Sequence, residues 1–153
     1  MENERKNELM LNTLQSGLFD ESKVKKLTTL DINDENESTL LLNSMQNCEF
    51  KLNDFVGKTL EIVGCYVTER EREEVNEENG EMYIRKTHTL MLFDVDGNAY
   101  VTGSNSCFMS FKDIVSLKGL PTKENHLVVE PIKVPAKTKE HSYLKLKLVT
   151  NKK

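Results

Sequence analysis

The stretch that decides the fold, residues 93–117, reads FDVDGNAYVTGSNSCFMSFKDIVSL. Near its start, Asp96-Gly97 is a strong turn signal between two strands. Residues 81–94 before the turn and residues 98–102 after it have strand-like composition. The stretch therefore predicts an antiparallel hairpin followed by a helix.

A helix is predicted over residues 107–117. The preceding residues 103–106, Gly-Ser-Asn-Ser, offer several possible N-caps. The apolar side chains of the segment recur at the spacing of one helical face: Phe108, Phe111, Ile114 and Val115. Gly119 and Pro121 are expected to end the helix.

Outward from this stretch, the sequence predicts one strand upstream and two downstream. Residues 59–72 form a β-branched, apolar run in which Gly64 indicates a bend or bulge. The acidic residues 77–80 form the expected tip of a long hairpin to residues 81–94. Two further strands are predicted over residues 126–134 and 142–149.

Three strands, one helix and two strands is the order of an OB-fold. We therefore predict an all-β fold with one helix, a five-stranded Greek-key barrel of order β-β-β-α-β-β. A β-sandwich is the competing architecture, but it usually has about seven strands and no central helix. The domain is assigned to residues 51–150. Residues 1–50 form an N-terminal arm that either lies over the domain or is partly disordered or helical.

We expect a single domain that is located in the cytoplasm. The chain has 153 residues, of which 37% are hydrophobic. It has no apolar run of about 18 residues, so no membrane span is predicted, and the start MENERK lacks the apolar core of a secretory signal. Its three cysteines are widely spaced, which indicates reduced thiols.

Charge is distributed unevenly along the chain. The net charge is −4, yet residues 106–153 contain 10 basic and 4 acidic side chains. Local charge, more than the net value, governs attraction of a polyanion. The basic final third is therefore the first place to look for phosphate contacts.

A family resemblance adds to these predictions. The segment Tyr-Val-Thr-Gly-Ser-x-Ser-x-Phe from Tyr100 to Phe108, together with FKLNDFVGK at residues 50–58, resembles single-stranded DNA-binding proteins of phages and conjugative elements of Gram-positive bacteria. The resemblance covers roughly residues 40–149. It implies an OB-fold that coats single-stranded DNA, without strong sequence preference, in replication or transfer of a phage or conjugative plasmid.

The resemblance also implies that no metal, nucleotide cofactor or active site is needed. In agreement, residues 103–106 lack the ending of a phosphate loop, and residues 94–97 lack the later ligands of a calcium loop. We predict that the chain is not an enzyme. One departure is the ending LVTNKK, because housekeeping single-strand binding proteins end in an acidic Pro-Phe tail that recruits partners.

Single-strand binding needs cations along a groove and aromatic faces on which bases stack. In OB-folds, the face of strands two and three and the loops joining strands one to two and four to five carry the ligand. The candidates on the first three strands are Tyr66, Arg70, Arg72, Tyr83, Arg85, Lys86 and Tyr100. Tyr100 either stacks on a base or packs in the barrel.

The last two strands and their loop are the more basic candidate surface. They contribute Lys133, Lys137, Lys139, His141, Tyr143 and Lys145. The carboxylates of residues 69–78 are awkward for DNA binding, because they repel phosphate over about 8 Å at physiological salt. Either this hairpin projects away from DNA, or its carboxylates pair with Arg70, Arg72 and Arg85.

Two other functions remain open: an OB-fold adaptor that contacts a replication or transfer protein, and an RNA binder. Leucines in the arm, at Leu9, Leu11, Leu14, Leu18 and residues 40–42, suggest self-association by docking on a neighbouring subunit.

Overall fold

The computed structural model describes residues 24–135 and 142–150. These residues form two helices, one 3-10 turn and seven strands. In chain order they are β1 Val24–Thr28, α2 Glu35–Gln46, β2 Phe50–Lys51, η1 Leu52–Phe55, β3 Leu60–Val75, β4 Met82–Asp94, β5 Ala99–Thr102, α3 Asn105–Lys118, β6 Leu127–Pro135 and β7 Ser142–Leu148. Neither described helix is long and apolar enough to cross a membrane.

The chain divides into two compact units, and strands β3 and β4 contribute to both. Of the described residues, the hairpin unit comprises Glu69–Thr87 together with residues 24–25. The core unit comprises Lys26–Thr68 together with residues 88–135 and 142–150.

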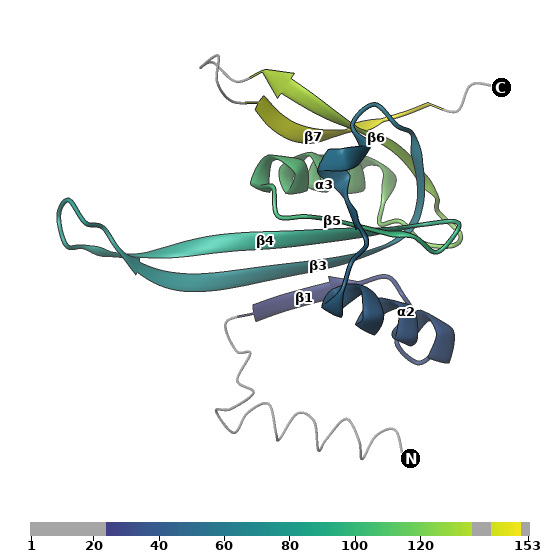
Figure 1. Cartoon of the computed structure of the whole chain (residues 1–153), viewed down its shortest axis with the longest axis horizontal. Helices are drawn as coiled ribbons and strands as arrows, with labels where there is room; N and C mark the ends of the chain where they lie inside the picture. The colour runs from purple at the N-terminus through teal and green to yellow at the C-terminus, as the bar shows by residue number, and fades with distance from the viewer. Residues whose placement is uncertain (1–23, 136–141, 151–153) are drawn as a thin grey trace. The chain divides into compact units, whose positions relative to one another are not determined.

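The strands form one strongly curled, mixed sheet (Figure 1). Their order is β2-β5-β4-β3-β6-β7, with β1 paired to β3. Strands β3, β4 and β5 follow one another, and β6 then returns beside β3, which is the order of a Greek key. The predicted succession of three strands, a helix and two strands agrees with β3 to β7 and α3. The short parallel pair of β2 with β5 makes the sheet mixed.

The first hydrophobic cluster lies between α3 and one face of the sheet. Leu90 and Leu92 of β4 contribute to it, together with Phe111 and Ile114 of α3. Tyr100 of β5 is buried in the same cluster. Two residues of the predicted apolar helix face, Phe111 and Ile114, are therefore buried against the sheet.

A second hydrophobic cluster lies on the opposite face of the sheet and includes a residue of α2. Figure 1 shows the position of this helix. Leu30 and Leu41 from the N-terminal segment pack there against Tyr66, Met91 and Phe93. Consecutive residues of β4 are therefore buried on alternate faces, which explains the unbroken apolar run at residues 90–93.

Helix α2 lies in the N-terminal arm, for which a partly helical structure was one of the alternatives, but its position was not predicted. Asp34 caps it, its side chain accepting a hydrogen bond from the Glu37 amide at 2.9 Å. Only Leu41 and Ser44 of this helix are buried. A helix that buries so narrow a stripe has a mostly polar sequence, and that sequence looks like a linker.

Near Gly64, where a bend or bulge was predicted, the alternation of strand β3 shifts by one residue, so that residues of the other parity point into the first cluster. Leu60 and Ile62 belong to the first cluster, and so does Cys65, which has the opposite parity. This change requires one extra residue in the strand, as in a β-bulge. A Cβ atom on Gly64 would lie 2.7 Å from the Leu30 side chain, so glycine also makes room for the second cluster.

Candidate nucleic-acid interface

Three exposed side chains form a row on one face of strand β7: Tyr143, Lys145 and Lys147. We call this row the β7 strip. They alternate with Leu144 and Leu146, which are buried in the first cluster. Because side chains two apart in a strand share a face, the row follows directly from the sequence alternation.

The β7 strip combines an aromatic face with two cations that have no carboxylate partner among the described residues. Tyr143 is 51% exposed. Neither Lys145 nor Lys147 forms an ion pair with a carboxylate among the residues that the structure describes. In the register of β6 and β7, Lys147 lies opposite Glu130, whereas Tyr143 and Lys145 lie opposite Val134 and Ile132. The charge of Lys145 is therefore the less compensated of the two.

Helix α3 holds β7 in place through two serines one turn apart. The Ser106 hydroxyl donates to the Leu144 carbonyl at 2.9 Å, and the Ser110 hydroxyl accepts from the Leu146 amide at 2.8 Å. Four helical residues rise about 6 Å and two strand residues about 6.6 Å, so the spacings match. The two hydroxyls satisfy backbone groups along the edge of the last strand of the sheet. Sequence reasoning missed this contact.

Helix α3 begins and ends near the predicted residues. It starts at Asn105, two residues earlier than predicted, and Ser104 is its N-cap, accepting from the Cys107 amide at 3.2 Å. Gly119 ends it with a φ of 81°. These caps fix which turn of the helix presents Ser106 and Ser110 to β7.

The other predicted residues near β7 are divided. Lys133 is exposed but lies opposite Leu144, so it projects from the other face of the sheet than the β7 strip. Lys137, Lys139 and His141 lie outside the described residues.

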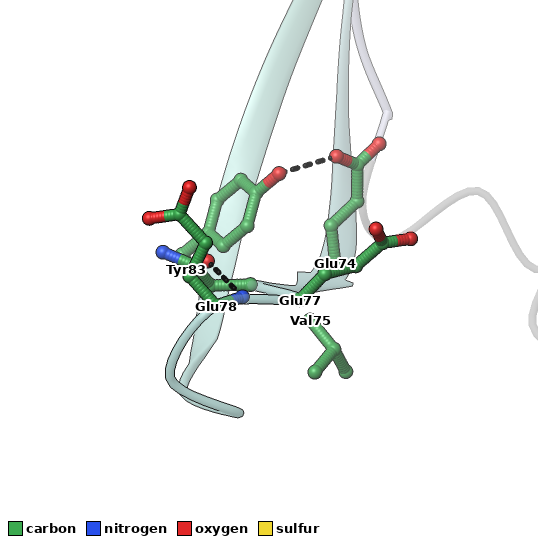
Figure 2. A pocket seen from close by; sticks show the side chains of 6 residues that line it. Glu74, Val75, Glu77, Glu78 and Tyr83 are labelled. Carbon is green, nitrogen blue, oxygen red and sulfur yellow. Dashed lines mark hydrogen bonds between the residues drawn. The ribbon is translucent and has the colours of Figure 1, made fainter.

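The hairpin unit contains a second surface, which we call the Tyr83 face. It consists of Tyr83 and Arg85 of β4 and, by alternation along β3, Arg70, Arg72 and Glu74. The Tyr83 hydroxyl donates to Glu74 Oε2 at 2.7 Å, as Figure 2 shows. Arg85 Nη1 lies 3.5 Å from Glu74 Oε1. One carboxylate thus binds both predicted β4 residues of this face.

The hydrogen bond between Tyr83 and Glu74 shifts the pKa of both side chains. The bond from Tyr83, followed by the charge of Arg85 and that of Arg72, lowers the pKa of Glu74. The same bond raises the pKa of Tyr83. Glu74 is therefore held in its charged form on this face.

The opposite face of the hairpin contains Lys86, so the predicted set of Tyr83, Arg85 and Lys86 is split. Lys86 Nζ lies 3.8 Å from Glu69 and 3.7 Å from Glu71. Met82 and Ile84 are also on this face, 66% and 62% exposed. They have the same parity along β4 as Leu90 and Leu92, which are buried in the first cluster. Alternation identifies a shared face of a strand but not what covers it.

Two predicted tyrosines are buried. Tyr66 is 6% exposed and packs in the second cluster. Tyr100 is 4% exposed, and its hydroxyl donates to Asp94 at 2.7 Å. Burial first, and then the bond to Asp94, raises the pKa of Tyr100 to about 12. Of the two alternatives for Tyr100, the structure places it in the core, so neither ring belongs to an exposed face.

Sequence reasoning left two residues out of the candidate set. Lys147 continues the alternation of Tyr143 and Lys145, and this signal was present in the sequence. Phe108 is partly exposed, stacked on His88 with ring centroids 4.1 Å apart, and Lys112 Nζ lies 5.8 Å from its ring centroid. The helical spacing of Phe108 had placed it on the apolar face with Phe111. No local signal in the sequence distinguishes a buried from a partly exposed position on that face.

The described residues contain neither a disulfide nor a cluster of side chains suited to a metal ion. Cys65 and Cys107 are buried and Cys48 is half-buried, all as free thiols. Burial raises the pKa of Cys65 to about 11 and that of Cys107 to about 12. No group of three or more His, Cys, Asp or Glu side chains in the described ranges is arranged to hold a metal ion.

Comparison with protein families, with curated proteins and with solved structures finds no match for this chain.

Proposed function

We propose that this protein binds single-stranded DNA without strong sequence preference, and that its core unit is an OB-fold. The Greek-key order with a helix after the third strand of the meander supports the fold, because this is the connectivity of OB-folds. The role in replication or transfer of a mobile element rests only on the sequence resemblance at residues 50–58 and 100–108.

The observation that carries the proposal is the β7 strip. A nonspecific single-strand site needs an aromatic ring on which any base can stack and cations that follow the phosphates. Tyr143 supplies an accessible ring, and Lys145 and Lys147 follow it along the same strand at about 6.6 Å per two residues. An ammonium group without a carboxylate partner loses no ion pair when it binds a phosphate.

The test is fluorescence anisotropy with a labelled DNA strand of about 30 nucleotides, long enough for at least one OB-fold site of roughly 4–16 nucleotides. Duplex of the same sequence and an RNA strand are titrated beside it, at about 50 mM and about 200 mM salt. We expect binding to the DNA strand that weakens with salt and is poor for duplex. No binding at low salt contradicts the proposal and favours the protein adaptor, and preferential RNA binding favours the RNA alternative.

Variants of the β7 strip locate the site. Tyr143→Ala should weaken binding about 5- to 150-fold, since a stacked base contributes about 1–3 kcal/mol, whereas Tyr143→Phe should bind like the wild type. Lys145→Gln should make the slope of log K against log salt concentration less steep by about 0.7, the value of one phosphate contact on a single strand. Lys118→Gln, an equal charge change in the last turn of α3, is the control. If Lys145→Gln and Lys118→Gln behave alike, the strip is not the site.

A further inference from the structure

The Tyr83 face of the hairpin unit has the composition of an anion site that is already filled. Within the strands, Arg70, Arg72 and Arg85 provide three positive charges against the one carboxylate of this face, that of Glu74. Glu77 and Glu78 lie beyond it, at the tip of the hairpin. That carboxylate accepts the Tyr83 hydroxyl at 2.7 Å and lies 3.5 Å from Arg85. Guanidinium and hydroxyl groups are also the donors that bind phosphate oxygens in nucleic-acid complexes.

We propose that Glu74 occupies the position of a nucleic-acid phosphate, and that a backbone phosphate displaces it to bind Tyr83, Arg85 and Arg72. This inference rests on the proposed function. Displacement is feasible because the ion pair is exposed: the side chain of Arg85 is 61% accessible and that of Glu74 is 27% accessible. Exposed ion pairs contribute little to stability, so exchanging one anion for another disturbs the hairpin little.

The acidic tip of the hairpin limits where the phosphate can approach. A hollow of about 630 Å³ at the tip is lined by Tyr83 and by three carboxylates, those of Glu74, Glu77 and Glu78 (Figure 2). These carboxylates repel phosphate within a Debye length of about 8 Å. The phosphate therefore approaches Tyr83 from the side of Arg72 and Arg85, away from the tip.

Removing the competing charge should strengthen binding. We expect Glu74→Gln, which keeps the shape of the side chain, to bind the DNA strand about 2- to 5-fold more tightly at low salt, the equivalent of one exposed ion pair. The salt dependence should become steeper by about 0.7, because one more phosphate is contacted. The gain should disappear in the double variant with Arg85→Gln.

Glu71→Gln is the matched control. It removes the same charge from the same strand but from the opposite face, where Lys86 keeps its second partner Glu69 at 3.8 Å. We expect little change in affinity and no change in the salt slope. Equal behaviour of the two variants overturns the inference, because it reduces the effect to the net charge of the hairpin.

A second measurement separates this inference from the proposed function. Inorganic phosphate is titrated into wild type and Glu74→Gln while NMR follows the Arg85 side-chain NH and the Tyr83 ring signals. If the protein does not bind the DNA strand but these signals respond more strongly in Glu74→Gln, the anion site stands and the proposed function fails. If they respond in neither protein, or equally in both, the anion site is refuted.

Discussion

Replacing Ser110 with alanine tests whether α3 holds the edge of strand β7. The Ser110 hydroxyl accepts from the Leu146 amide at 2.8 Å and donates to the Cys107 carbonyl at 2.8 Å. Leu146 is 5% exposed, so water cannot readily replace the lost acceptor. A buried donor without a partner costs about 1–3 kcal/mol.

The chain supplies a matched control for this substitution on the same helix. The Ser116 hydroxyl donates to the Asp113 carbonyl at 2.7 Å, also three residues back, but it is exposed and forms no hydrogen bond with the described residues of β7. Both substitutions gain about 0.5 kcal/mol of helix propensity. The difference in the free energy of unfolding between Ser110→Ala and Ser116→Ala therefore measures the cost of leaving the Leu146 amide without an acceptor. We expect this cost to be about 1–3 kcal/mol. For a chain of this size that corresponds to a melting temperature lower by about 2–12 °C.

Urea unfolding followed by circular dichroism measures the difference, and hydrogen exchange locates it. The midpoint should fall for Ser110→Ala with the m-value unchanged, and the Leu146 amide should exchange faster. Equal midpoints for the two variants, with the Leu146 amide still protected, would falsify the role of Ser110 at the edge of β7.

Two further predictions concern buried titratable groups. The pKa of Tyr100 is raised to about 12 from an ordinary value near 10, so the folded state holds this proton more tightly. Its stabilisation is complete below about pH 10 and is lost as the pH rises toward 12. Urea unfolding at several alkaline pH values should show a shallower loss of stability for Tyr100→Phe than for wild type, and identical profiles would contradict the assignment. Among the cysteines, Cys48 should react first with a thiol reagent at about pH 8 in the folded protein, because it is only half-buried whereas Cys65 and Cys107 are buried. Burial raises the pKa of all three thiols, that of Cys65 to about 11 and that of Cys107 to about 12. Rapid reaction of a second thiol before denaturant is added would refute this.

Local features of the fold were predictable from the sequence because each depends on a few neighbouring residues. The turn at Gly97 has a φ of 85°, which glycine adopts readily, and it lies where Asp96-Gly97 predicted it. Ser104 and Gly119 begin and end α3 as expected of a cap and a terminator. In the candidate site, the exposed alternation of Tyr143 and Lys145 was also readable, since a strand presents every second residue on one face.

The burial of particular faces was decided only by tertiary structure. Tyr66 and Tyr83 both looked like aromatic residues available to a base, yet α2 and the segment around Leu30 cover the first and leave the second exposed. The pairing of Glu74 with Tyr83 and Arg85, and of Ser110 with Leu146, joins residues whose sequences give no sign of the partner. Periodicity determines which side chains share a face. What covers that face depends on contacts between distant segments, which no local pattern encodes.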